Sequence, residues 1–156
     1  MPAFFRLYFL QHFTTFYNNF TPILLECNIY NIYIQMLIKN VLLSLLILVS
    51  LDSIYLFFIK NLFEKHISLI QNSPLKINMH GAIICYIFLV LGLNYFILST
   101  NKGVLDAFIL GLVIYAVFES TNLALFKKWP YYFVLVDTLW GGILFASTTY
   151  IIRKIK

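Results

Sequence analysis

Three carboxylates stand in stretches of the sequence that are otherwise almost wholly apolar. Asp52, Glu119 and Asp137 are half of the six acidic residues, and each lies inside a run long enough to cross a bilayer. A carboxylate at mid-bilayer costs at least ~2.5–3.5 kcal/mol on insertion scales, and it normally faces a bundle interior. The chemistry open to such groups is proton exchange, cation binding or hydrogen bonding between helices.

These carboxylates have no internal counter-charge, because no Lys, Arg or His falls at their depth in the predicted spans. They are either partly protonated, since burial and mutual repulsion disfavour the charged form, or they hold an external cation. A third interpretation is purely structural, with carboxylic acids that join helices through hydrogen bonds. The sequence leaves the three alternatives open.

Four apolar windows must position these groups, and basic residues flank them. A transmembrane helix needs about 20 mostly apolar residues. The windows run over residues 41–59, 79–98, 104–126 and 131–152, and every Lys and Arg falls outside them. The connections around 99–103 and 127–130 are short, which forces antiparallel neighbours. We therefore predict an all-α fold, a membrane-spanning up-down four-helix bundle.

The composition predicts a multi-pass integral membrane protein whose partner is the lipid bilayer. Of 156 residues, 62% are hydrophobic and 11% are charged, whereas soluble domains average about 25% charged. The net charge of +5 is scattered between the apolar runs. Interfacial anchoring accounts for it, and nucleic-acid binding is excluded because no basic face is clustered. The sequence sets no oligomeric state.

The three carboxylates share one depth. Asp52 and Glu119 lie seven residues before the ends of their windows, and Asp137 lies six residues after the start of its window. All three ends are on one side of the membrane, so each carboxylate lies ~9–10 Å below that surface. Tyr86 enters at the same depth from the remaining helix. Each helix therefore supplies one polar group to one layer.

Helical spacing adds neighbours to this layer. Tyr115 and Asn122 share a stripe with Glu119, and Trp140 lies one turn after Asp137. Small residues on the same faces, Gly111 and Gly141, allow close approach of backbones. The candidate ligand- or ion-binding residues are Asp52, Tyr86, Tyr115, Glu119, Asn122, Asp137 and Trp140.

No catalytic motif stands out in the sequence. It has no nucleophile elbow, no phosphate-binding Gly loop and no His/Cys metal set. We predict no catalytic residue and no cofactor, and we lean against an enzyme, although a carboxylate trio could hold a divalent ion for lipid-modifying chemistry. The leading interpretation is a membrane protein that binds or transports a proton, a cation or a small polar solute. The alternative is a non-catalytic scaffold or interaction protein whose buried acids are structural.

The flanking segments divide the chain into an aromatic-rich extension over 1–40, the transmembrane domain over 41–152 and a basic tail over 153–156. The extension is either an interfacial helix or a stretch upstream of a translation start at Met36. Residues 60–78 are predicted to form an amphipathic loop on the membrane surface. Trp129 is predicted to anchor at the membrane interface, and Asn94 to hydrogen-bond across helices.

The last hairpin carries a recognisable pattern. Residues 111–116 and 119–124 read GLVIYA and ESTNLA, and Trp129-Pro130 and the run DTLWG over 137–141 follow them. This resembles the domain of unknown function family 2177, small predicted four-helix membrane proteins with approximately Y-A-x-x-D-x-T-N-L-A, then W-P, then D-x-x-W-G. Leu51-Asp52 begins a stretch similar to the family's L-D-x-x-W-L.

The resemblance covers about residues 36–152. It implies the four-helix fold and marks the same acids, and it implies no activity. Two positions depart from the family pattern, because Glu119 stands where Asp is usual and Tyr55 where Trp is usual.

Overall fold

A computed structural model of the chain describes the backbone of residues 3–155 and the side chains of residues 34–155. The question of an aromatic interfacial arm, which concerns side chains before residue 34, lies outside the described residues. The chain forms two compact units, Met1–Lys39 and Asn40–Lys156. All side-chain contacts discussed below lie within the second unit.

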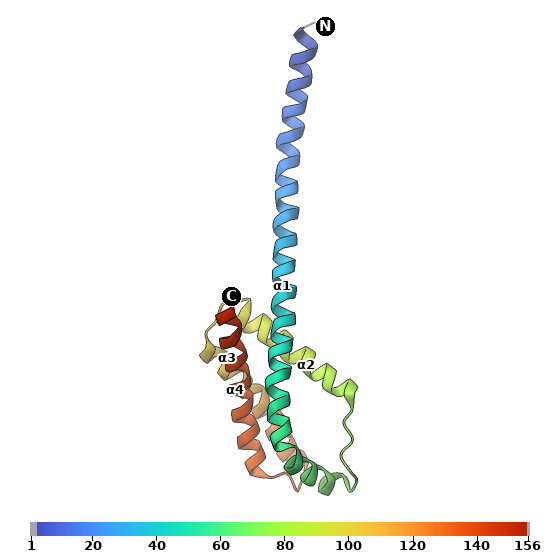
Figure 1. Cartoon of the computed structure of the whole chain (residues 1–156), viewed down its shortest axis with the longest axis vertical. Coiled ribbons are helices and arrows are strands. Elements are labelled where there is room, and N and C mark those ends of the chain that lie inside the picture. The colour runs from blue at the N-terminus through green and yellow to red at the C-terminus, as the bar shows by residue number, and fades with distance from the viewer. Residues whose placement is uncertain (1–2, 156) are drawn as a thin grey trace. The chain divides into compact units, whose positions relative to one another are not determined.

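Between residues 3 and 155, four α-helices make up the fold (Figure 1). They are α1 (Ala3–Gln71), α2 (Met79–Leu93), α3 (Val104–Leu125) and α4 (Tyr131–Ile155), and a π-helical turn, η1 (Asn94–Leu98), extends α2. Among residues 34–155, four helical stretches are long and apolar enough to cross a membrane, namely Ile34–Gln71, Met79–Leu98, Val104–Leu125 and Tyr131–Ile155. The predicted all-α, membrane-spanning four-helix bundle is confirmed, and the chain is a multi-pass integral membrane protein.

The segment after the first span differs from the prediction. Residues 60–71 are helical and continue α1, whereas we expected a loop over 60–78. An i,i+4 ion pair between Lys60 and Glu64, with N···O of 3.8 Å, supports the helix in this region. The helix ends where Asn72 takes a left-handed φ of 53°, and Pro74 follows, a combination typical of helix C-termini. The amphipathic pattern over residues 60–71 therefore belongs to a helix and not to a loop.

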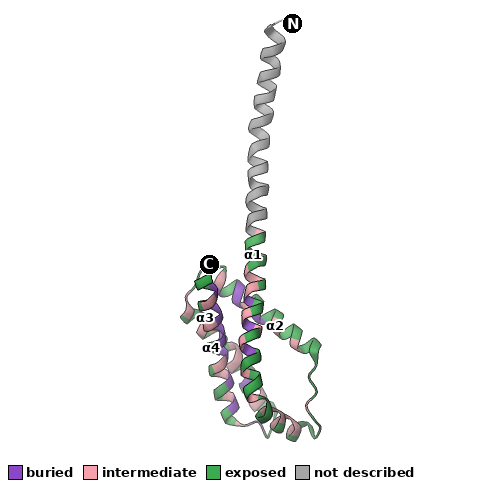
Figure 2. Cartoon of the chain, in the orientation of Figure 1, coloured by how far each residue is buried: buried purple, intermediate pink, exposed green. Residues whose placement is uncertain are grey.

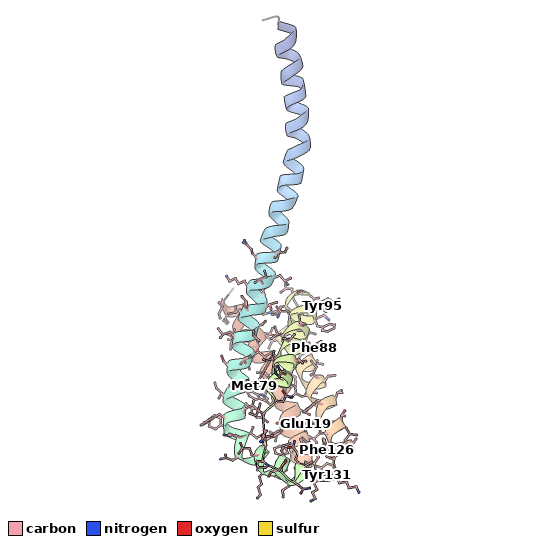
Figure 3. All side chains as sticks on the ribbon, turned by 90° about the vertical axis from the view of Figure 1, so that its right-hand side faces the viewer. Met79, Phe88, Tyr95, Glu119, Phe126 and Tyr131 are labelled. Atoms are coloured by element: carbon pink, nitrogen blue, oxygen red, sulfur yellow. The ribbon has the colours of Figure 1, made fainter. Side chains whose placement is uncertain are left out.

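Figures 1 and 3 show this last part of α1 turning across the end of the bundle, toward the α3–α4 connection. Aromatic contacts hold it there. The Phe63 and Phe133 rings lie 5.4 Å apart, and the His66 and Phe133 rings 5.2 Å apart, both edge to face. The half-buried His66 ring also forms a hydrogen bond with the Tyr132 hydroxyl group, with 3.2 Å between Nε2 and the oxygen.

Helices α3 and α4 pack closely because small residues face each other. The backbones of Gly111 and Gly141 meet so tightly that a Cβ atom on Gly111 would lie 2.8 Å from the Gly141 carbonyl carbon. This confirms the predicted close approach at these two glycines. Around it lies the apolar core: Leu48, Leu89, Val90, Leu93, Ile97, Ala107, Leu144 and Phe145.

The outward faces of the helices are apolar and exposed, as helices in contact with lipid require. Figure 2 shows buried residues on the facing sides of the helices and exposed residues outside. Phe57 and Phe58 of α1 are 77% and 80% exposed, and Phe88 of α2, labelled in Figure 3, is 68% exposed. The polar groups that matter must therefore be sought inside the bundle.

A buried amide secures η1 to the first span. Asn94 is 4% exposed and donates hydrogen bonds to Ser44 Oγ, at 2.7 Å, and to the Val90 carbonyl, at 2.9 Å. The predicted cross-helix hydrogen bond of Asn94 is therefore confirmed. At the following turn, Asp106 accepts a 2.8 Å hydrogen bond from the Gly103 N–H group and caps α3.

Candidate functional site

Asp52 is the hub of the buried polar network. It lies in the membrane-spanning part of α1 and is 7% exposed. Its Oδ2 atom accepts a hydrogen bond from the Tyr86 hydroxyl group of α2, at 2.6 Å. Its Oδ1 atom accepts one from the Trp140 indole N–H of α4, at 2.8 Å. Both carboxylate oxygens are thus satisfied, and one side chain joins three helices.

Asp137 forms the reciprocal pair. It is buried on α4 and accepts a hydrogen bond from the Tyr55 hydroxyl group of α1. The Tyr55 and Trp140 rings stack with centroids 4.3 Å apart and planes 9° apart. On each helix an acid precedes an aromatic donor by three residues. Because α1 and α4 run in opposite directions, each acid meets the donor of the other helix.

Glu119 is the most deeply buried of the three acids. It lies on α3, is labelled in Figure 3, and has no exposed surface. Its Oε2 atom accepts a 2.7 Å hydrogen bond from the Trp129 indole N–H. Its Oε1 atom is buried and has no hydrogen-bond partner within the described residues. An unsatisfied buried carboxylate oxygen is costly, so this atom calls for an explanation.

Glu119 and Asp137 are neighbours across the α3–α4 interface, close enough for their carboxyl groups to interact. Asn122, half-buried one turn further along α3, is also within interaction range of Glu119. None of the three buried acids has a cationic partner, since the one ion pair among the described residues joins Lys60 and Glu64.

The predicted site residues therefore divide into three groups. Asp52, Tyr86 and Trp140 form one hydrogen-bonded cluster, and Asp137 joins it through Tyr55, whose ring stacks on Trp140. Glu119 and Asn122 lie beside Asp137. Tyr115 has a different position. Its ring packs against the backbone of Gly141, so close that a Cβ on that glycine would lie 2.7 Å from the Tyr115 Cβ. Its contact supports helix packing.

Two hydrogen-bond donors to the buried acids, Tyr55 and Trp129, were not predicted as site residues. Tyr55 shares a helix face with Asp52 at i+3, a signal that was present in the sequence. Trp129 was predicted to anchor at the membrane interface, but it is 6% exposed and reaches back to Glu119. Phe63 and Phe133 cover its ring, with centroids 6.2 Å and 6.1 Å away. The helical period cannot reveal this contact, because a turn separates the two partners.

A metal centre does not form from these groups. Within the part of the chain that the structure describes, no three His, Cys, Asp or Glu side chains come together as metal ligands. The aromatic O–H and N–H groups occupy four of the six carboxylate oxygens of Asp52, Glu119 and Asp137. The arrangement suits groups that exchange protons or hydrogen bonds better than groups that surround a divalent ion.

Comparison with known proteins adds a family and no activity. The profile of a family described as "Predicted membrane protein (DUF2177)" matches residues 37–152. No curated protein and no solved structure matches the chain. The matched range includes Asp52, Glu119 and Asp137 and the aromatic donors that bind them, and it spans well over half of the sequence. The chain therefore belongs to DUF2177, a family of predicted membrane proteins.

Proposed function

We propose that this membrane protein binds a proton between helices α3 and α4, shared by Glu119 and Asp137. The observation that carries the proposal is the Oε1 atom of Glu119, which is buried without a partner beside a second carboxyl group. A proton on one carboxyl group would give that pair a hydrogen bond and remove one buried negative charge. Both changes lower the cost of burying two acids together.

Protons fit this pair better than metal ions do. A divalent cation prefers six or more oxygen ligands, and the described residues offer no group of three acidic, His or Cys ligands. Asp52 differs from the pair, because neutral donors satisfy both of its oxygens. Asp52 therefore has no free oxygen with which to share a proton, whereas Glu119 and Asp137 each have one.

A scaffold function is the second candidate, and the reciprocal pairs between α1 and α4 favour it. Two hydrogen bonds, Trp140 to Asp52 and Tyr55 to Asp137, join α1 and α4. Both are complete without a bound ligand. In that case the acids stabilise the bundle and exchange no proton during function. Protonation and flux measurements separate the two candidates.

Infrared spectroscopy tests the shared proton. We expect the protein in detergent at neutral pH to show the C=O stretching band of a protonated carboxyl group, because the pair has no cationic partner. Glu119→Gln and Asp137→Asn should each remove or shift this band. Glu64→Gln is the matched control and should leave it unchanged, since Glu64 pairs with Lys60. Absence of the band from the unmodified protein would rule out the shared proton.

Proton flux in liposomes tests whether the bound proton moves across the membrane. If it does, a pH gradient should decay faster with the unmodified protein than in empty liposomes. Glu119→Gln should return the rate to that of empty liposomes, because the amide cannot release a proton. Reconstitution at matched protein density, with Glu64→Gln in parallel, controls for leakage. Unmodified protein without flux, together with an intact carboxyl band, would favour the scaffold.

A further inference from the structure

A small recess opens where the end of α1 meets the α3–α4 connection. Its volume is about 240 Å³, and residues from both segments line it: Leu69, Ile70, Asn72, Leu125, Phe126, Lys127 and Lys128. The recess lies at the end of the α3 span, which ends at Leu125. It therefore lies at the level where a spanning helix passes from acyl chains to lipid headgroups.

The charge of the recess is positive and uncompensated. Lys127 and Lys128 are exposed, and the one ion pair among residues 34–155 joins Lys60 and Glu64. No acidic residue lines the recess. A larger adjoining recess of about 680 Å³ shares Asn72, but its lining includes the acidic Glu64. Charge complementarity thus singles out the smaller recess for an anion.

The other wall of the recess is apolar and faces outward. Leu125 is 71% exposed, Leu69 is 52% exposed and Phe126 is 40% exposed. Exposed apolar side chains beside two free ammonium groups match an amphiphile, whose anionic end meets the lysines while its hydrocarbon follows the leucines. The volume is smaller than the roughly 300–1,000 Å³ of a pocket for a drug-sized molecule. It suits a headgroup whose acyl chains remain outside, in the bilayer.

We propose that this recess binds the headgroup of an anionic phospholipid. The ammonium groups of Lys127 and Lys128 contact its phosphate, and Leu69, Leu125 and Phe126 contact the first part of its acyl chains. Basic pockets between transmembrane helices bind anionic headgroups in this way. The site is separate from the buried carboxylates, and it does not rest on proton binding.

Lipid titration of the full-length protein tests the site. In detergent, phosphatidylglycerol should raise the melting temperature more than phosphatidylcholine with the same acyl chains, and native mass spectrometry should detect it bound. Lys127→Gln/Lys128→Gln should weaken phosphatidylglycerol binding about 10- to 30-fold. Each lysine near an anionic lipid surface raises the binding affinity about fivefold, and the variant removes two. Lys127→Arg/Lys128→Arg should retain binding.

A matched control removes two charges from the opposite end of the bundle. Lys102→Gln/Lys154→Gln should leave phosphatidylglycerol binding within twofold of the unmodified protein. Equal losses in the two glutamine variants would overturn the site, since net charge alone would then explain the binding. Stabilisation by inorganic phosphate as strong as that by the lipid would overturn the lipid as its ligand. No preference for phosphatidylglycerol over phosphatidylcholine would also overturn the proposal.

Discussion

Replacing Gly111 by alanine should destabilise the four-helix domain by about 1–3 kcal/mol. The added Cβ would collide with the carbonyl oxygen of Gly141 and would lie 2.8 Å from its carbonyl carbon and 2.9 Å from the Phe145 Cβ. Two of these neighbours are backbone atoms, so α3 and α4 must move apart. Unfolding in detergent with increasing denaturant, followed by helical circular dichroism, measures the loss.

Other glycines of the same domain provide controls for this substitution. A Cβ on Gly92 would meet nothing within 4 Å, so Gly92→Ala should be neutral or should stabilise by up to ~1 kcal/mol through helix propensity. A Cβ on Gly142 would lie 2.7 Å from the Phe108 ring, which can rotate away, so an intermediate loss is expected. If Gly111→Ala is as stable as Gly92→Ala, the close backbone contact is wrong.

The fold could be predicted because the bilayer restricts what a chain can do. Apolar runs of about 20 residues bounded by Lys or Arg leave a helix as the one simple solution. The window expected over 79–98 matches the span Met79–Leu98, and the next begins at Val104 as expected. The end of α1 was mispredicted as a loop, because the mixture of polar and apolar residues over 60–71 was read from composition and not from its helical period.

The membership of the site was predictable only in part. Burial of Asp52, Glu119 and Asp137 follows from the cost of placing acids in lipid, and the helical period brings Tyr86 and Trp140 to their depth. Their pairing does not follow from these rules, because the rotation of each helix about its axis decides which donor meets which acid. Tyr55, for example, donates its hydrogen bond to Asp137 and not to Asp52, its neighbour in the sequence.

Trp129 shows most clearly what a sequence pattern cannot reveal. A tryptophan beside two lysines and a proline at the end of a span is typical of an interfacial anchor. Here the α3–α4 turn directs the indole inward, where Phe63 and Phe133 cover the ring and Glu119 accepts a hydrogen bond from the indole N–H group. The indole N–H thus binds one oxygen of the carboxyl group whose other oxygen, Oε1, is fully buried without a hydrogen-bond partner among the described residues.

Removing that donor should have a large effect. Trp129→Phe leaves the Glu119 carboxyl group with no hydrogen bond from an aromatic donor, and an uncompensated buried acid is expensive. We expect a loss of about 2–4 kcal/mol in the free energy of unfolding, measured by denaturant titration in detergent. Tyr132→Phe removes an exposed hydrogen bond to His66 at 3.2 Å. As the control, it should cost less than about 1 kcal/mol.

A double-mutant cycle separates two effects of Trp129→Phe: the loss of the hydrogen bond to the Glu119 carboxyl group, and the loss of packing by the larger indole ring. Glu119→Met replaces the acid by an apolar side chain of similar length, and combining it with Trp129→Phe removes donor and acceptor together. Replacing both partners by apolar groups can be nearly neutral, so the double variant should be more stable than Trp129→Phe alone. The interaction free energy should reach at least ~1 kcal/mol. Additive losses would mean that the indole contributes packing alone and that Glu119 does not depend on its N–H group.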